Sequence, residues 1–202
     1  RAGLEDGQSV LELGCGWGSL ALHMAERLPN SRIVGVSNSR SQKEYIDSVR
    51  REKGIHNLEI LTADINDFHA PGQFDRVVSV EMFEHVRNYP ELLRRISQWL
   101  TPEGRLFVHI FVHKSFSYPY EPRGPSDWMA RYFFTGGTMP GANLLNEFRD
   151  HMRIKQEWRI NGRHYQKTLE AWIRQMDSHR PEIMPVLANT YGEAEARTWW
   201  MR

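Results

Sequence analysis

The stretch Val10–Leu20, VLELGCGWGSL, decides how the rest of the chain is interpreted. It begins as an apolar run, and Gly14, Gly16 and Gly18 then follow at every second position before a helical pattern starts. A glycine-rich turn between a strand and a helix lets a ligand approach the backbone closely, at the edge of the sheet where α/β proteins bind ligands. The stretch therefore predicts a nucleotide-binding turn.

The residues around this turn argue against a dinucleotide. The dinucleotide fingerprint is G-x-G-x-x-G with an acidic residue about 20 positions later. Here the turn is G-x-G-x-G, and the segment 34–42, VGVSNSRSQ, has no acid where the second expected strand ends. Glu12 precedes the turn, where a carboxylate would repel a pyrophosphate but suits the cationic end of S-adenosylmethionine. The alternative is a tight turn that binds no ligand.

The remaining pattern predicts an α/β fold. Short β-branched runs alternate with helical patterns, which is typical of βαβ units in a doubly wound, mostly parallel, Rossmann-like sheet. We expect strands at 9–13, 32–37, 58–64, 74–80 and 105–113, helices at 19–28, 39–54 and 90–100, and a turn at 101–104.

An aromatic-rich insertion follows the fifth expected strand. Beyond it we expect a helix near 143–153, a strand near 154–160 and a helix at 164–179. Residues 1–113 would form the cofactor-binding core, and residues 114–202 the substrate-lining insertion and the C-terminal part of the same domain. The aromatic residues expected to line a substrate pocket, or else to form a small core under the loop, are Phe116, Tyr118, Tyr120, Trp128, Tyr132, Phe133 and Phe134.

Composition limits the class of partner. The chain has 202 residues, 40% of them hydrophobic, which suffices for one globular domain. With 26 Lys and Arg against 25 Asp and Glu, the net charge of +1 creates no field that attracts nucleic acid or an anionic membrane. No apolar run approaches the ~20 residues that span a bilayer, and Cys15 is the single cysteine. We expect a small-molecule partner, a cytoplasmic location and no metal site; the pattern leaves the oligomeric state open.

The two ends of the sequence predict a fragment. Arg1 is not an initiator methionine, no signal peptide follows it, and the last residues, EARTWWMR, stop inside a helical pattern.

The candidate chemistry lies in residues 81–86, EMFEHV, directly after the fourth expected strand. If this segment is helical, Glu81, Glu84 and His85 share one face. An alkylamine with a pKa of about 10.4 costs roughly 4 kcal/mol to deprotonate at pH 7, and a nearby carboxylate or imidazole can take that proton. Close carboxylates also raise one another's pKa, which makes a better base. The alternative is a solvated acidic patch or a loop cap.

Four segments carry a family resemblance: LELGCGWGSLALHMAE, GVSNSRSQKEYI, LTADINDF and FDRVVSVEMFEHVRNY. In this order they resemble class I S-adenosylmethionine-dependent methyltransferases, in the branch of cyclopropane-fatty-acyl-phospholipid synthases and plant coclaurine-type N-methyltransferases. The likeness continues through HIFVHKSFSYPY, DWMARYFFTGGTMP and NGRHYQKTLEAW, and so covers nearly the whole chain. In that family a helical region precedes the first strand and a terminal strand follows the last helix. Neither is present in this sequence, in agreement with the expected fragment.

The resemblance implies a site for S-adenosylmethionine. The three glycines would line its methionine and ribose end, with Glu12 supporting the turn. Ser37 and Gln42 match positions that bond the ribose hydroxyls, and Asp64 and Ile65 match the pair that meets adenine. Read alone, the first two could be helix-entry residues and Asp64 an ordinary loop acid. The full expected set is Glu12, Gly14, Cys15, Gly16, Gly18, Ser37, Asn38, Gln42, Asp64 and Ile65.

The resemblance implies two different reactions for the two branches. In the N-methyltransferases, residues matching Glu81, Glu84 and His85 hold and deprotonate the amine. In the cyclopropane synthases the first position is typically glycine, and a bicarbonate base is held by residues matching Glu84, His109 and Tyr165. All five residues occur here.

Glu81 and Phe111, the latter standing where an aliphatic bicarbonate ligand is expected, favour the amine reaction. We therefore expect methyl transfer to a small amine, with Glu81 and Glu84 holding the ammonium and His85 or Glu84 accepting its proton. His109 and Tyr165 keep open a cyclopropane synthase that acts on unsaturated acyl chains with bicarbonate. A third possibility is a domain that binds the cofactor without turnover.

Overall fold

The computed structural model describes residues 1–201, which form two compact units that divide between Ile154 and Lys155. The division at residue 113 expected above concerns function, and it stays a prediction.

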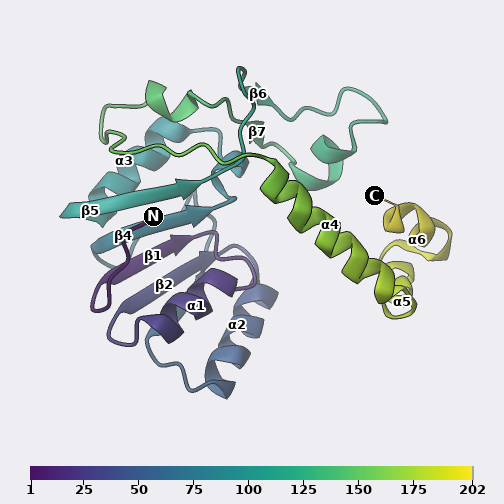
Figure 1. Ribbon diagram of the computed structural model, residues 1–202, viewed down its shortest axis with the longest axis horizontal. Helices are drawn as coiled ribbons and strands as arrows, with labels where there is room; N and C mark the ends of the chain where they lie inside the picture. The colour runs from purple at the N-terminus through teal and green to yellow at the C-terminus, as the bar shows by residue number, and fades with distance from the viewer. Residues whose placement is uncertain (202) are drawn as a thin grey trace. The chain divides into compact units, whose positions relative to one another are not determined.

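A parallel sheet organises the first unit. Its strand order is β3-β2-β1-β4-β5, and every neighbouring pair runs parallel (Figure 1). Because β1 lies beside β4, the winding of the chain reverses between them, and ligands bind such sheets at the carboxyl ends of the strands that flank this point. The predicted doubly wound sheet is confirmed. Its strands are β1 (Ser9–Leu13), β2 (Arg32–Ser37), β3 (Leu58–Thr62), β4 (Phe74–Val80) and β5 (Leu100–His109).

Helices cover both faces of the sheet, which explains why its central strands are almost wholly apolar. On one face, α1 (Ser19–Arg27) and α2 (Arg40–Glu52) bury Ala21, Met24 and Ile46. Ser39 caps α2 by accepting a hydrogen bond from the Gln42 N–H. These helices begin and end within two residues of the predicted bounds.

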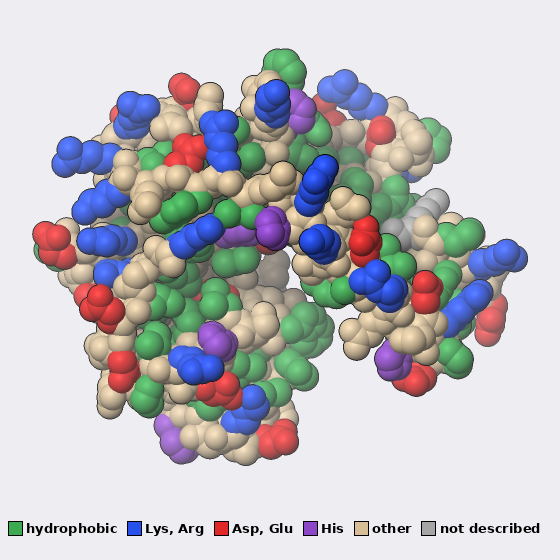
Figure 2. All heavy atoms as spheres, in the orientation of Figure 1, with side chains coloured by type: hydrophobic (Ala, Val, Ile, Leu, Met, Phe, Trp, Pro, Cys, Tyr) green, Lys and Arg blue, Asp and Glu red, His purple; other side chains and the backbone are tan. Residues whose placement is uncertain are grey.

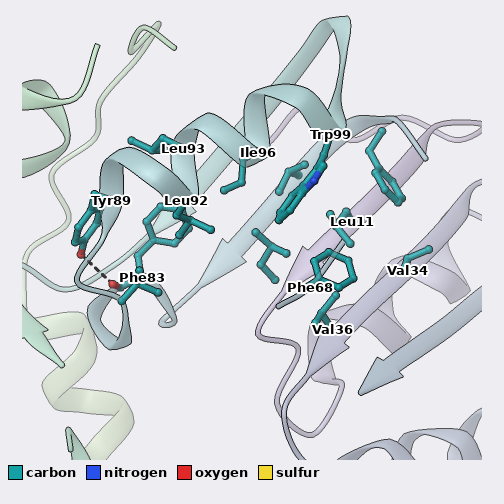
Figure 3. Close-up of a cluster of buried hydrophobic side chains, with 14 residues drawn as sticks. Leu11, Val34, Val36, Phe68, Phe83, Tyr89, Leu92, Leu93, Ile96 and Trp99 are labelled. Carbon is teal, nitrogen blue, oxygen red and sulfur yellow. Dashed lines mark hydrogen bonds between the residues drawn. The ribbon is translucent and has the colours of Figure 1, made fainter. Parts of the chain in front are cut away.

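The other face is covered by α3 (Tyr89–Trp99) (Figure 3). Asn88 caps this helix by accepting from the Glu91 N–H, and Pro90 lies in its first turn. The Tyr89 hydroxyl donates to the Phe83 carbonyl at 2.9 Å, which ties the segment after β4 to α3. The α3-side cluster comprises Leu11, Leu13, Val34, Val36, Phe68, Phe74, Val77, Phe83, Val86, Tyr89, Leu92, Leu93, Ile96 and Trp99.

The fifth strand differs from its prediction at both ends. Residues 101–104 do not separate α3 from the strand but form an irregularity inside it, since Phe74 pairs with Leu100 whereas Arg76 pairs with Arg105. Pro102 is tolerated because β5 is an edge strand. The strand ends at His109, and His113 forms an isolated bridge with Gly141 instead.

Two predictions beyond the strand are wrong. Residues 143–153 contain only the short 3-10 helix η3 (Leu144–Glu147), because Leu145, Phe148 and Met152 pack against the α3-side cluster as an irregular segment. Residues 154–160 alternate in polarity, but no described strand pairs with them and no strand forms. The insertion itself contains β6 (Tyr118–Pro119), η2 (Met129–Phe133) and β7 (Thr138–Met139).

The second unit is helical. It contains α4 (Arg163–Ser178), α5 (Arg180–Tyr191) and α6 (Glu193–Trp200), and α4 confirms the helix predicted at 164–179. Within residues 1–201, no helix combines the length and the apolar character that crossing a bilayer requires. Acidic and basic side chains are interspersed over the face shown in Figure 2.

Replacing Phe74 with alanine tests the core. The side chain is fully buried in the α3-side cluster. Phe74→Ala should therefore lower the free energy of unfolding by about 3 to 5 kcal/mol in urea denaturation. The matched control is Phe116→Ala, because Phe116 is 68% exposed and its loss should cost about 0.5 kcal/mol or less. Equal losses for the two variants would contradict this core.

Candidate functional site

The glycine turn lies between β1 and α1 and needs its glycines for backbone reasons. Gly14, Gly16 and Gly18 have φ values of +79°, +53° and +82°, in the left-handed region where other residues are strained. The N–H groups of Gly14 and Cys15 both donate to the Val36 carbonyl, at 3.0 and 2.9 Å. The turn is thereby fastened to the end of β2.

The three glycines differ in what surrounds them. A Cβ on Gly14 would lie 2.6 Å from Met82 Cγ, and one on Gly18 would lie 2.6 Å from Ile46 Cγ1. A Cβ on Gly16 would meet nothing within 4 Å. Two glycines therefore allow close packing within the protein, and Gly16 is the position open to an approaching ligand.

Glu12 is a buried acid within β1, followed by the buried Leu13. Its side chain is 3% exposed, and its buried Oε2 has no hydrogen-bond partner among the described residues. Burial raises the pKa of Glu12 to about 7. A carboxyl group in this position is stable either protonated or beside a cation. Cys15 is also buried, and burial together with the charge of Glu12 raises its thiol pKa to about 12.

The ends of β2 and β3 carry the other expected cofactor residues. Ser37 Oγ donates to Gln42 Oε1 at 2.6 Å, so the structure brings this pair together, while Asn38 is exposed beside it. Asp64 is exposed, and its Oδ1 accepts from the backbone N–H and side-chain amide of Asn66, both at 2.8 Å. Ile65 is half-buried and packs against the α3-side cluster.

The helical face predicted for residues 81–86 is wrong. Only Phe83–His85 form a single 3-10 turn, η1, and Glu81 precedes it in the left-handed region with φ +52°. The Glu81 N–H donates to the His109 carbonyl at 2.9 Å, which continues the β4–β5 pairing by one residue in place of a helix.

Glu81 and His109 form an ion-pair contact across the strand ends. Glu81 Oε1 lies 3.0 Å from His109 Nδ1. Burial raises the pKa of Glu81, and the neighbouring His109 opposes that rise. The structure thus joins two candidate catalytic residues that sequence reasoning had assigned to different reactions.

Glu84 is the most buried acid of the segment, at 1% exposed, and its Oε2 is buried without a hydrogen-bond partner among residues 1–201. Burial, with a contribution from the charge of Glu81, raises the pKa of Glu84 to about 7. The backbone here is held closely, since a Cβ on Gly137 would lie 2.7 Å from the Glu84 carbonyl oxygen. Sequence reasoning missed Gly137 and Met82; the only available signal was the paired glycines at 136–137.

An aromatic cluster lies against this segment, with Phe134 at its centre. The His85 ring stacks on Phe134 at 5.2 Å, and partial desolvation of the imidazole lowers its pKa although the residue remains exposed. Tyr120 stacks on Phe134 at 4.6 Å, and Phe111 and Phe133 contact it edge-on. Of the other expected pocket residues, Phe116 and Tyr118 contact His113, and Trp128 contacts Tyr132.

Tyr165 lies in the second unit, near the start of α4, and is half exposed. Its expected relation to Glu84 and His109 stays a prediction. Within residues 1–201, no three His, Cys, Asp or Glu side chains are grouped as ligands for a metal ion.

Glu12→Gln tests the buried carboxyl of β1 through the pH dependence of stability. The native pKa is raised from 4.5 to about 7, so the folded protein holds this proton more tightly than the unfolded chain. The resulting stability is fully present below pH 4.5 and is lost as the pH rises through 7, amounting to about 3 kcal/mol. We expect the Gln variant to lose this share of the decline in unfolding free energy between pH 4.5 and 8, measured by urea denaturation.

Glu84→Gln is the matched control, because burial gives Glu84 a similarly raised pKa and a separate share of the same decline. The variant that carries both Glu12→Gln and Glu84→Gln should lose both contributions to the decline in unfolding free energy. An unaltered pH profile in Glu12→Gln would mean that this carboxyl is ionised in the native protein.

Several known proteins are similar to this chain in sequence and in fold. A coclaurine N-methyltransferase from Thalictrum flavum subsp. glaucum is 41% identical over 96% of this chain and 54% of its own length. The cyclopropane-fatty-acyl-phospholipid synthase of Escherichia coli strain K12 is 33% identical over 94% of this chain and 46% of its own length. The chain therefore spans about half the length of the curated relatives it matches.

A solved structure agrees with this likeness. Coclaurine N-methyltransferase bound to N-methylheliamine and SAH superposes with a TM-score of 0.88 at 40% identity, covering 95% of this chain and 56% of that one. The fold is therefore that of a Rossmann-like class I methyltransferase, and the resemblance seen in the sequence is confirmed. The family described as mycolic acid cyclopropane synthetase matches residues 1–201, and the chain belongs to this family.

Proposed function

We propose that the protein containing this chain transfers a methyl group from S-adenosylmethionine to a small amine. The observation that carries the proposal is the pair of acids after β4. Among the described residues the buried Oε2 of Glu84 has no hydrogen-bond partner, and Glu81 lies close enough to raise the pKa of Glu84. A buried carboxylate is costly unless a cation neutralises it, and an ammonium group is such a cation. These acids follow the strand that lies beside the glycine turn.

The residues around the turn fit S-adenosylmethionine, which supplies a methyl group on a positively charged sulfur. Glu12 offers a buried, unpaired carboxyl group to the cationic part of the ligand. The open space at Gly16 leaves room for the ligand beside the backbone. Ser37 and Gln42 would exchange their mutual hydrogen bond for hydrogen bonds to the ribose hydroxyls. Asp64 and Ile65 would contact the adenine ring.

The chemical need at the second substrate is to lose a proton. An alkylamine is protonated at pH 7, and exposing its lone pair costs roughly 4 kcal/mol. Glu84, whose buried Oε2 has no hydrogen-bond partner among the described residues, would hold the ammonium while a base at the same edge of the sheet takes its proton. The stacked rings of Tyr120 and Phe134 offer faces that attract a cationic amine.

The names of the relatives narrow the class of amine. They include coclaurine, pavine and tetrahydroprotoberberine N-methyltransferases, and the solved relative holds N-methylheliamine. We propose a cyclic amine attached to an aromatic body as the substrate, and the cytoplasm, where the single thiol of Cys15 stays reduced, as the location.

A second candidate is cyclopropane formation on an unsaturated acyl chain with a bicarbonate base. The family match and the presence of Glu84, His109 and Tyr165 favour it. Against it stands the Glu81 carboxylate beside His109, since an anion there repels a bicarbonate.

Gly16→Val tests the cofactor site. The new side chain would fill the open space at the turn, and we expect calorimetry to detect no binding of S-adenosylmethionine. Gly54→Val is the matched control, because Gly54 also has a positive φ, +64°, and open space at its Cβ but lies at the end of α2. Cofactor affinity that survives in Gly16→Val would remove the turn from the site.

Glu84→Gln tests the reaction. We expect kcat/KM for methylation of heliamine to fall by about 10² to 10³, because the buried carboxylate that holds the ammonium is lost, with little change in cofactor affinity. Labelled S-adenosylmethionine should be offered to heliamine and to unsaturated phospholipid vesicles, with and without bicarbonate. Label in the lipid that depends on bicarbonate would establish the second candidate, and cofactor binding without any labelled product would indicate a binding domain.

A further inference from the structure

Glu81 and His109 are joined by two contacts at the ends of neighbouring strands. The Glu81 N–H donates to the His109 carbonyl at 2.9 Å, and Glu81 Oε1 lies 3.0 Å from His109 Nδ1. The backbone hydrogen bond aligns the two residues, and the side-chain contact turns the Glu81 carboxylate toward the His109 ring. A pair held in this way differs from two independent acids and bases that face a substrate.

Glu81 adopts a conformation that glycine would adopt without strain. It is the only non-glycine residue with a positive φ within the described chain, at +52°. Such strain persists where the surrounding contacts enforce it, and it concentrates at functional sites. Two contacts of the strained residue go to His109, so the strained backbone holds Glu81 where its carboxylate can position the His109 ring.

The contact favours one tautomer of His109. With a carboxylate 3.0 Å from Nδ1, a neutral imidazole is stabilised when its hydrogen lies on Nδ1, which leaves the lone pair on Nε2. A base oriented by a carboxylate is the arrangement found in hydrolase triads. His85 is placed differently, because its ring stacks on Phe134 and desolvation lowers its pKa, which makes it a weaker base.

We propose that His109 Nε2 accepts the proton of the amine and that Glu81 is a positioning residue for His109 and does not hold the ammonium. This inference rests on the proposed function. The ammonium N–H bond breaks and its proton passes to Nε2, which leaves the electron pair on the amine nitrogen. The nitrogen then attacks the methyl carbon. The N–C bond forms as the C–S bond breaks, the bonding pair stays on sulfur, and the imidazolium later releases its proton to water.

The other titratable groups at this edge come from three elements. Glu84, from η1, interacts with Glu81. Tyr89, from α3, and Tyr120, beside β6, interact with Glu84. His85 completes the set. Glu81 therefore interacts with His109 directly, and Glu84 interacts with His109 through Glu81.

The tautomer of His109 can be tested without turnover. In protein labelled with ¹⁵N-histidine, the long-range ¹H–¹⁵N spectrum should show neutral His109 with its proton on Nδ1, the signal being assigned by its absence in His109→Gln. Glu81→Gln should increase the share of the Nε2–H form. A wild-type His109 protonated on Nε2 would overturn the proposed orientation.

The pH dependence of turnover tests the proton transfer. With heliamine and S-adenosylmethionine, kcat/KM of the wild type should show an acidic limb that belongs to His109. His109→Gln should lower kcat by about 10² to 10⁴ and abolish this limb. Glu81→Gln should lower kcat/KM, because His109 loses the carboxylate that positions it. Glu81→Asp should recover most of the wild-type rate.

His85→Gln is the matched histidine control and should keep the acidic limb in place. If His85→Gln abolishes the limb and His109→Gln keeps it, the inference fails while amine methylation stands. If the wild type methylates no amine, the proposed function fails, and the tautomer still reports whether Glu81 positions His109. Glu81→Gly separates folding from function, because it relieves the backbone strain: the unfolding midpoint should hold or rise while kcat falls. A lower midpoint together with unchanged kcat would overturn the positioning role.

Discussion

The parallel pairing of β1 with β4 is the interaction on which the site depends. Leu13 pairs with Ser79 at the end of this ladder, and the buried Ser79 hydroxyl donates to the Leu13 carbonyl at 3.2 Å. The pairing places a glycine turn after one strand and an acidic segment after the other at the same edge. Because helices cover both faces of the sheet, this edge is where backbone and polar side chains can meet a ligand. The proposed cofactor and amine sites therefore become neighbours through the topology of the sheet.

Most of the core could be predicted from the sequence because burial imposes a regular spacing on the apolar residues of a strand or helix. The first four strands and α1 to α4 follow apolar patterns with recognisable caps, such as Ser39 before α2 and Asn88 before α3. The predictions failed where the pattern had another cause. Leu145 and Phe148 are apolar because they pack against the α3-side cluster and not because they belong to an α-helix. Residues 154–160 alternate like a strand, but a strand requires a neighbour, which a local pattern does not report.

The candidate site was predictable in its members but not in their surroundings. The glycine spacing and Glu12 could be identified from sequence, and so could the acids after β4. The burial of Glu12 Oε2 and Glu84 Oε2 without a hydrogen-bond partner among the described residues could not, because it depends on side chains from several elements. The contact between Glu81 and His109 likewise requires β4 and β5 to end side by side. A helical arrangement of residues 81–86 was the natural reading of their spacing, and the bond from the Glu81 N–H to β5 prevents it.

The fit of Gly14 against Met82 links the two halves of this edge in a further way. A single added carbon at residue 14 would come within 2.6 Å of the Met82 side chain, which lies between Glu81 and Phe83. A side chain at residue 14 would therefore meet the Met82 side chain in addition to the strain of its positive φ, and the effects of changing both residues would not add. Sequence change in the glycine turn is thus restrained by the acidic segment, even at a residue that carries no side chain of its own.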